Sequence, residues 1–185
     1  GRGDGYKSLI LDRLRVCSTE ADAVTDSQFV SEAAVEDLEL KQQLFARIEE
    51  CVANDTILAS NTSTHPMTRI AEGMRHPGRA LVTHPFNPPH IIPVVEVVPG
   101  EKTTPETVDM TVALLKRIGK QPVRLNKELP GFLVNRVLLP YMAESLQLLR
   151  EGAAMDEIDE ASIQFGMPMG PIALHDLVGL DTALY

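Results

Sequence analysis

Short apolar runs alternate with amphipathic stretches between residues 28 and 125 of this 185-residue chain, and no other sequence feature restricts the fold as strongly. The apolar runs have the length of buried strands. The longer stretches between them carry helix-start and helix-stop signals such as Asp37 and Gly119. Strands that alternate with helices predict a parallel α/β sheet. The expected strands are residues 28–34, 57–60, 79–83, 91–98 and 123–125, and the expected helices begin at Asp37, Pro66 and Thr104.

The pattern changes after Lys127, where the strand signals stop and long apolar stretches with helical spacing begin. Residues 131–150 predict one helix, with a kink at Pro140 because proline cannot donate the hydrogen bond that the helix needs there. Two further helices are expected at residues 156–165 and 172–184. We therefore expect two structural parts, an α/β part at residues 1–126 and an all-helical part at residues 127–185.

The composition argues against several classes of protein. The chain has 17 Lys and Arg against 26 Asp and Glu, and this argues against a nucleic-acid partner because phosphate binding needs clustered basic residues. No apolar run approaches the ~20 residues of a membrane helix. Cys17 and Cys51 lie far apart and form no metal-binding or redox motif. We therefore expect no metal site, no membrane span and a reduced cytoplasmic setting, or the mitochondrial matrix or peroxisome in a eukaryote.

Polar side chains follow three successive predicted strands. Glu36 comes after the first strand, residues 61–63 (Asn-Thr-Ser) follow the second, and His84 and Asn87 follow the third. The carboxyl ends of parallel strands meet at one edge of a sheet, where ligands bind in open α/β folds. This mixture of side chains can bind a ligand there and can move protons.

Glu96 is an unusual residue for its position, because valines flank it on both sides in residues 94–98. A carboxylate in a buried strand is costly without a partner, and His84 at the neighbouring strand end is the expected one. Such a pair increases the basicity of the imidazole, fixes its tautomer and stabilises the imidazolium. The alternative is that Glu96 faces solvent on an edge strand.

Two other polar positions leave alternatives open. Ser63 and Thr64 precede Pro66, so either can cap the following helix instead of binding a substrate. Asn135 lies in an apolar helical stretch, where its amide can bond a ligand or another helix. The remaining histidines are expected in solvated, capping or packing positions, at residues 65, 76, 90 and 175.

Six segments of the chain occur in an order that is more specific than any segment alone. They are residues 32–37 (EAAVED) with Lys41, 59–63 (ASNTS), 84–88 (HPFNP), 94–98 (VVEVV), 130–136 (PGFLVNR) and 168–171 (PMGP). Together they resemble the L-3-hydroxyacyl-CoA dehydrogenase family. The stretches at 100–103 and 130–141 are most similar to the dehydrogenase part of multifunctional fatty-acid oxidation enzymes.

The resemblance implies a two-domain enzyme that oxidises a 3-hydroxyacyl-CoA reversibly to the 3-ketoacyl-CoA. A Rossmann-like domain would bind NAD, and a helical domain would bind substrate and form the contact of a homodimer. The alternative to a homodimer is that the full-length protein is part of a multifunctional complex. The implied ranges are the C-terminal part of the NAD-binding domain at residues 1–126 and part of the helical domain at residues 127–185.

The resemblance assigns roles to matching residues. His84 would be the general base that takes the hydroxyl proton while a hydride passes to the nicotinamide, and Glu96 would orient His84. Ser63 and Asn135 would position the substrate oxygens. The residues implied along the nicotinamide side of the cofactor are Ala34, Val35, Glu36, Lys41, Ser63 and Asn87.

Three departures from the family pattern suggest alternatives. The first βαβ unit with its glycine fingerprint is expected to be missing, since residues 1–5 (GRGDG) follow no strand. The missing fingerprint makes a non-catalytic structural relative one alternative. The last part of the helical domain is also expected to be missing. Pro85 replaces the usual aromatic residue and favours another alternative, a sister branch that acts on free hydroxy acids, carnitine or sugar acids.

Overall fold

The computed structural model describes residues 11–178 and divides the chain into two compact units. The first unit ends at Glu128, and the second begins at Leu129. Within the described residues the first unit combines one sheet with helices, and the second contains helices without a sheet. The α/β fold class predicted from the alternating pattern is confirmed. Residues 1–5, where the rejected glycine-rich match falls, lie outside the described residues.

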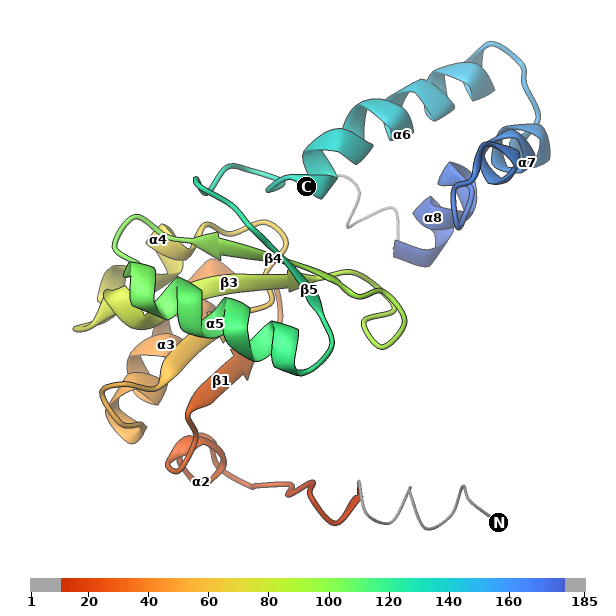
Figure 1. The fold of residues 1–185 in the computed structure, drawn as a ribbon. Coiled ribbons are helices and arrows are strands. Elements are labelled where there is room, and N and C mark those ends of the chain that lie inside the picture. Colours follow the sequence, from red (N-terminus) through yellow and green to blue (C-terminus); the bar gives the residue numbers. More distant parts are fainter. Residues whose placement is uncertain (1–10, 179–185) are drawn as a thin grey trace, which may run out of the picture. The chain divides into compact units, whose positions relative to one another are not determined.

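One sheet contains the strands of the described chain, in the order β1-β2-β3-β4-β5. All neighbouring strands are parallel except β3 and β4, which Figure 1 shows pointing in opposite directions. The expectation of a parallel sheet is therefore wrong at this junction, because a short connection at residues 86–93 replaces the crossover helix that parallel strands require. The strands are β1 Phe29–Glu32, β2 Ile57–Ser60, β3 Ala80–Pro85, β4 Val94–Pro99 and β5 Gln121–Arg124.

Capping residues explain where the main helices of the first unit begin. The Asp37 side chain accepts a hydrogen bond from the backbone N–H of Leu40, and Thr104 does the same for Thr107. Gly119 follows the end of α5 with φ of 80°, a left-handed conformation that glycine adopts without strain. The helices are α2 Glu20–Val24, α3 Leu38–Cys51, α4 Met67–Ile70 and α5 Pro105–Arg117, with short 3-10 turns at Ala71–Gly73 and Pro77–Arg79.

The hydrophobic core determines which face of the sheet holds the polar residues. α5 lies across the near face of the sheet in Figure 1 and α3 lies on the far side. Side chains alternate between the two faces along a strand, so residues next to core positions on β3 and β4 point away from α5. His84 and Glu96 are such residues. The core against α5 contains Ala59, Leu81, Val95, Val97, Val108 and Leu115.

The second unit begins its long helix later than the sequence predicted. Gly131 and Phe132 have positive φ values of 74° and 48°, which no α-helix accommodates, and α6 begins at Val134. Pro140 lies inside α6, as expected. The helices are α6 Val134–Arg150, α7 Met155–Phe165 and α8 Pro171–Val178, and the predicted continuation to residue 184 lies outside the described residues.

No helix within residues 11–178 is long and apolar enough to cross a lipid bilayer. In the same residues, no group of three or more His, Cys, Asp or Glu side chains is arranged to hold a metal ion.

Candidate active site

His84 and Glu96 form a buried pair at the junction of β3 and β4. They are direct partners in the antiparallel register, and the Nδ1 atom of His84 lies 2.7 Å from Oε2 of Glu96. Glu96 is 0% exposed and His84 is 5% exposed. The predicted contact is therefore present, and the alternative of a solvent-facing Glu96 is wrong. β5 covers the outer side of β4, so Glu96 does not lie on an edge strand.

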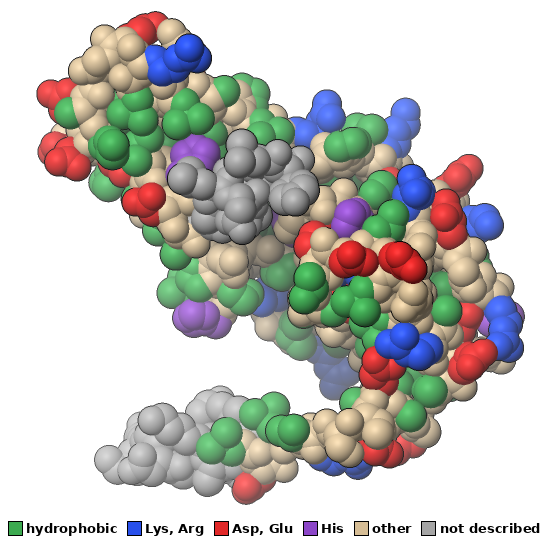
Figure 2. Space-filling view, turned by 180° about the vertical axis from the view of Figure 1, so that it is seen from behind, with side chains coloured by type: hydrophobic (Ala, Val, Ile, Leu, Met, Phe, Trp, Pro, Cys, Tyr) green, Lys and Arg blue, Asp and Glu red, His purple; other side chains and the backbone are tan. Residues whose placement is uncertain are grey.

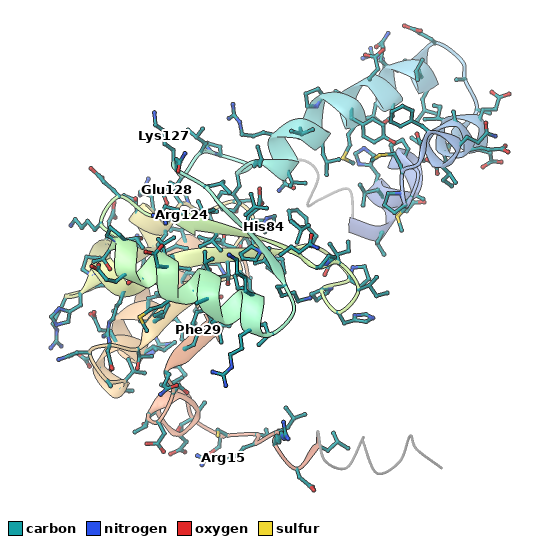
Figure 3. All side chains as sticks on the ribbon, viewed as in Figure 1. Arg15, Phe29, His84, Arg124, Lys127 and Glu128 are labelled. Atoms are coloured by element: carbon teal, nitrogen blue, oxygen red, sulfur yellow. The ribbon has the colours of Figure 1, made fainter. Side chains whose placement is uncertain are left out.

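The second ring nitrogen of His84 faces Ser63. Ser63 follows β2, and its Oγ lies 3.0 Å from Nε2 of His84. A carboxylate can only accept hydrogen bonds, so Nδ1 carries the ring proton toward Glu96 and Nε2 keeps its lone pair for the Ser63 side. The arrangement gives a base whose tautomer is fixed from behind and whose reactive nitrogen lies beside a hydroxyl. Figure 3 labels His84 on β3.

The Phe86 ring contacts the imidazole from the following loop. The centroids of the Phe86 and His84 rings are 4.8 Å apart with an interplanar angle of 72°, an edge-on arrangement. This contact restricts rotation of the imidazole on one side, while the Glu96 carboxylate restricts it on the other.

Glu36 holds the turn that carries Ser63. One carboxylate oxygen, Oε1, accepts hydrogen bonds from the backbone N–H groups of Ser63 and Thr64, each at 3.2 Å, and from the Thr64 hydroxyl at 2.7 Å. The Thr62 hydroxyl donates to the same oxygen. The other oxygen, Oε2, lies 3.3 Å from Nζ of Lys41. Glu36 therefore binds the chain on both sides of the serine as well as the serine itself.

The pKa of Glu36 follows from these contacts. Partial burial raises the pKa, but the hydrogen bonds from Thr62 and Thr64 and the charge of Lys41 outweigh that effect, and the pKa falls to about 2. Glu36 is therefore an anion throughout the physiological range.

A second carboxylate, Glu32, ends β1 and shares Lys41 with Glu36. Its Oε1 is 2.8 Å from Nζ of Lys41, and its Oε2 accepts a hydrogen bond from the Ser60 hydroxyl at 2.5 Å. Glu32, Lys41 and Ser60 are all buried. Sequence reasoning gave no separate role to Glu32 or Ser60, and it placed Thr62 at the strand end and Thr64 at a possible helix cap without predicting their bonds to Glu36. A charged residue within a predicted strand was the available signal, and it was present at Glu32 as well as at Glu96.

The other predicted site residues have different surroundings. Val35 is 73% exposed although it is apolar, and Ala34 and Asn87 are also exposed at the same sheet edge. Asn135 lies in the first turn of α6, in the second unit, and is half-buried. The structure thus brings Ser63, His84 and Glu96 together in the first unit, and the role of Asn135 stays a prediction.

Comparison with known proteins adds the family to this geometry. Residues 5–129 match the 3-hydroxyacyl-CoA dehydrogenase NAD binding domain, and residues 131–185 match the 3-hydroxyacyl-CoA dehydrogenase C-terminal domain. The chain belongs to the 3-hydroxyacyl-CoA dehydrogenase family. NAD is the cofactor that the first matching domain indicates.

Individual relatives agree with this assignment. The fatty acid oxidation complex subunit alpha of Shewanella amazonensis is 45% identical over 168 residues, which are 91% of this chain and 24% of that protein. FadB2 of M. tuberculosis superimposes with a TM-score of 0.91 at 36% identity, over 97% of this chain and 64% of that one. An (S)-3-hydroxybutyryl-CoA dehydrogenase from Ralstonia eutropha gives a TM-score of 0.88 at 36% identity, over 98% and 64%.

These relatives are longer than this member of the 3-hydroxyacyl-CoA dehydrogenase family. The chain spans about a quarter of the curated relatives that it matches, and 64% of the two solved structures. Family membership and the NAD-binding domain type follow from the comparisons. The comparisons do not establish the substrate or the catalytic residues.

Proposed function

We propose that the protein carrying this chain oxidises an L-3-hydroxyacyl-CoA to the 3-ketoacyl-CoA with NAD, a reaction of fatty-acid β-oxidation. The contact series Ser63–His84–Glu96 at the carboxyl ends of β2 and β3 supports this proposal most directly. A dehydrogenase of this kind must remove a hydroxyl proton, and an imidazole held in one tautomer beside a hydroxyl-binding group suits that task.

The residues of the chain supply the acid–base part of the reaction. Nε2 of His84 accepts the proton of the substrate hydroxyl, and Glu96 stabilises the imidazolium that results. Ser63 and Asn135 position the substrate oxygens, Ser63 by its hydroxyl 3.0 Å from Nε2. NAD, when bound, supplies the hydride acceptor. In the reverse direction the same imidazolium returns the proton to the alkoxide.

The edge of the sheet beside Ser63 suits the nicotinamide end of NAD. Val35 is an exposed apolar residue at an edge where most side chains are polar. Its side chain provides an apolar surface on which a flat ring can lie. Glu36, which is held by its 3.3 Å ion pair with the buried Lys41, forms the polar border of that surface. The residues that we propose to hold the cofactor are Ala34, Val35, Glu36, Lys41, Ser63 and Asn87.

The test is to substitute the base. In the intact protein, His84→Gln is expected to lower kcat for acetoacetyl-CoA-dependent NADH oxidation by about 100-fold or more, the contribution of a positioned general acid–base group. Glutamine preserves the approximate size and polarity of the side chain. A kcat within about threefold of the wild type would overturn the proposal.

A second candidate function keeps the chemistry and changes the substrate. Pro85 favours it: the residue after His84 lies at the end of β3 beside the base, where an aromatic residue is usual among the acyl-CoA enzymes. The enzyme would then act on a free hydroxy acid, carnitine or a sugar acid. Turnover of such a substrate without CoA, in a panel that includes acetoacetyl-CoA, would favour this candidate over the first.

A non-catalytic structural relative is the alternative from another class. Calorimetry with NAD tests it, because a protein that does not bind NAD cannot perform either oxidation. The alignment of His84 between Ser63 and Glu96 argues against this alternative, since a structural protein has no need of a fixed imidazole tautomer.

The surface of the second unit supports partner binding. Several large apolar side chains of α6 and α7 are exposed, and Phe165 is 87% exposed. Figure 2 shows hydrophobic side chains on one face of this unit. We propose that they form the contact of a homodimer or of a multifunctional complex. We also propose a reduced setting, either the cytoplasm or, in a eukaryote, the mitochondrial matrix or peroxisome, which agrees with the free thiols of Cys17 and Cys51. Light scattering of the intact protein with and without Phe165→Asp tests the contact: a mass that this substitution leaves unchanged would contradict it.

A further inference from the structure

Glu32 is a buried carboxylate for which the proposed reaction has no direct use. It ends β1, is 5% exposed, and lies opposite Ser60 in the parallel register of β1 and β2. A buried carboxylate is costly unless both oxygens have partners. Both oxygens of Glu32 have them, and each partner leads to the turn that carries Ser63.

The first connection runs through β2. Oε2 of Glu32 accepts the Ser60 hydroxyl hydrogen at 2.5 Å. The same Ser60 oxygen accepts a hydrogen bond from the backbone N–H of Thr62 at 3.2 Å. The hydroxyl of Ser60 thus joins the Glu32 carboxylate to the residue just before Ser63.

The second connection runs through α3. Oε1 of Glu32 lies 2.8 Å from Nζ of Lys41, which is 1% exposed and also lies 3.3 Å from the Glu36 carboxylate. Glu36 in turn accepts the backbone N–H groups of Ser63 and Thr64. Lys41 therefore neutralises part of the charge of two neighbouring carboxylates and holds Glu36 against the turn.

We propose that Glu32 is a positioning residue for Ser63 in the reaction of the proposed function, on which this inference rests. Glu32 also accepts a hydrogen bond from the backbone N–H of Ala34 at 2.5 Å, so it fixes the start of the loop that carries Glu36. Its two oxygens thereby hold the serine turn from the strand side and from the helix side. A displacement of about 1 Å at a reacting centre can cost on the order of 100-fold in rate, which makes such bracing functionally significant.

The experiment is a double-mutant cycle with Glu32→Gln and Ser63→Ala in the intact protein. Glutamine keeps the shape of Glu32, but it loses the charge that pairs with Lys41, and its amide nitrogen cannot accept the Ser60 hydroxyl. We expect Glu32→Gln alone to lower kcat for acetoacetyl-CoA-dependent NADH oxidation by on the order of 10-fold or more. In the Ser63→Ala background the same substitution should change kcat by less than about threefold, because the group that it positions is gone.

A matched control distinguishes positioning from general destabilisation. Glu49 is also buried, is paired with Arg79 at 3.4 Å, and accepts the backbone N–H groups of Arg75 and His76. Glu49→Gln therefore removes a comparable buried pair that has no connection to the Ser63 turn, and its effect on kcat should be small in both backgrounds. Ser60→Ala removes only the first connection, and it serves as the test if Glu32→Gln does not fold.

The possible outcomes separate this inference from the proposed function. If the effects of Glu32→Gln, or of Ser60→Ala, multiply with that of Ser63→Ala, the positioning role is overturned while the proposed function stands. If Ser63→Ala leaves kcat unchanged, the proposed role of Ser63 itself is wrong, and the positioning role falls with it. The proposal is supported if the effects of Glu32→Gln and Ser60→Ala on kcat become smaller in the Ser63→Ala background while the effect of Glu49→Gln stays the same.

Discussion

Nδ1 of His84 and Oε2 of Glu96 lie 2.7 Å apart because the antiparallel register of β3 and β4 makes these two residues direct neighbours. Directly opposed residues place their side chains on the same face of a sheet, so the pairing needs no bend or bulge. The backbone of the sheet thus sets the orientation of the base.

Substitution of the carboxylate should therefore affect the chemistry. Glu96→Gln is expected to lower kcat by on the order of 100-fold, because an amide can neither neutralise the imidazolium nor ensure that Nδ1 carries the proton. The measurement is the steady-state rate with acetoacetyl-CoA and NADH. Glu101→Gln, on the exposed turn after β4, is the control and should behave as the wild type. A kcat for Glu96→Gln that equals the control value would contradict the assigned role.

The lowered pKa of Glu36 predicts a pH dependence of stability. In the unfolded chain this group titrates near its ordinary value of 4.5, and in the folded chain near 2, so between these values the unfolded state binds more protons. The stabilisation is complete above about pH 4.5 and disappears as the pH falls toward 2. Urea unfolding should show that the stability difference between the wild type and Glu36→Gln narrows over this window. Glu39→Gln, which removes an exposed carboxylate in the first turn of α3, is the control.

The N-cap of α3 predicts a separate effect on stability. Asp37→Ala removes the acceptor for the Leu40 N–H and should lower the free energy of unfolding by about 1 kcal/mol. Asp37→Asn keeps an oxygen acceptor at the cap and should retain most of the stability. Equal losses in the two variants, measured by urea unfolding, would mean that the cap bond is not responsible.

The exposed valine predicts an effect on cofactor affinity. Val35→Asp places a charge on the proposed nicotinamide surface and should weaken NAD binding by about tenfold, or about 1.4 kcal/mol. The equivalent change on the outer face of α5, Met110→Asp, starts from a residue that is 58% exposed and should leave the affinity unchanged. Calorimetry of the intact protein with NAD decides between a specific and a general effect.

Sequence patterns predicted much of the fold, and the reasons are local. The run Ile57–Ser60 is buried at every position, so its limits were visible as an apolar segment. Asp37 and Thr104 begin α3 and α5 because their side chains cap the first turns, a signal that requires no tertiary information. Glu96 among valines indicated a buried pair, since a lone carboxylate there would be too costly.

Other features depend on contacts between distant parts of the chain. The direction of β4 was missed because strand alternation is the same in parallel and antiparallel pairs. The available signal was the short connection, since residues 84–90 between the two predicted strands are too few for a parallel crossover. The partners of Glu32 come from β2 and α3, so its charge was visible in the sequence but its network was not. Phe132 has a positive φ, which its residue type does not suggest. For this reason α6 begins after the predicted residue 131, at Val134.

The reversal of direction between β3 and β4 has one more consequence. Base and carboxylate lie on a single β-hairpin, Ala80–Pro99, with the connection at residues 86–93 as its tip. Hairpin tips tolerate changes of length and sequence better than the paired strands do. Sequence changes in this tip, which carries the Phe86 ring against the imidazole, can therefore alter the surroundings of His84 while the two strands keep His84 paired with Glu96.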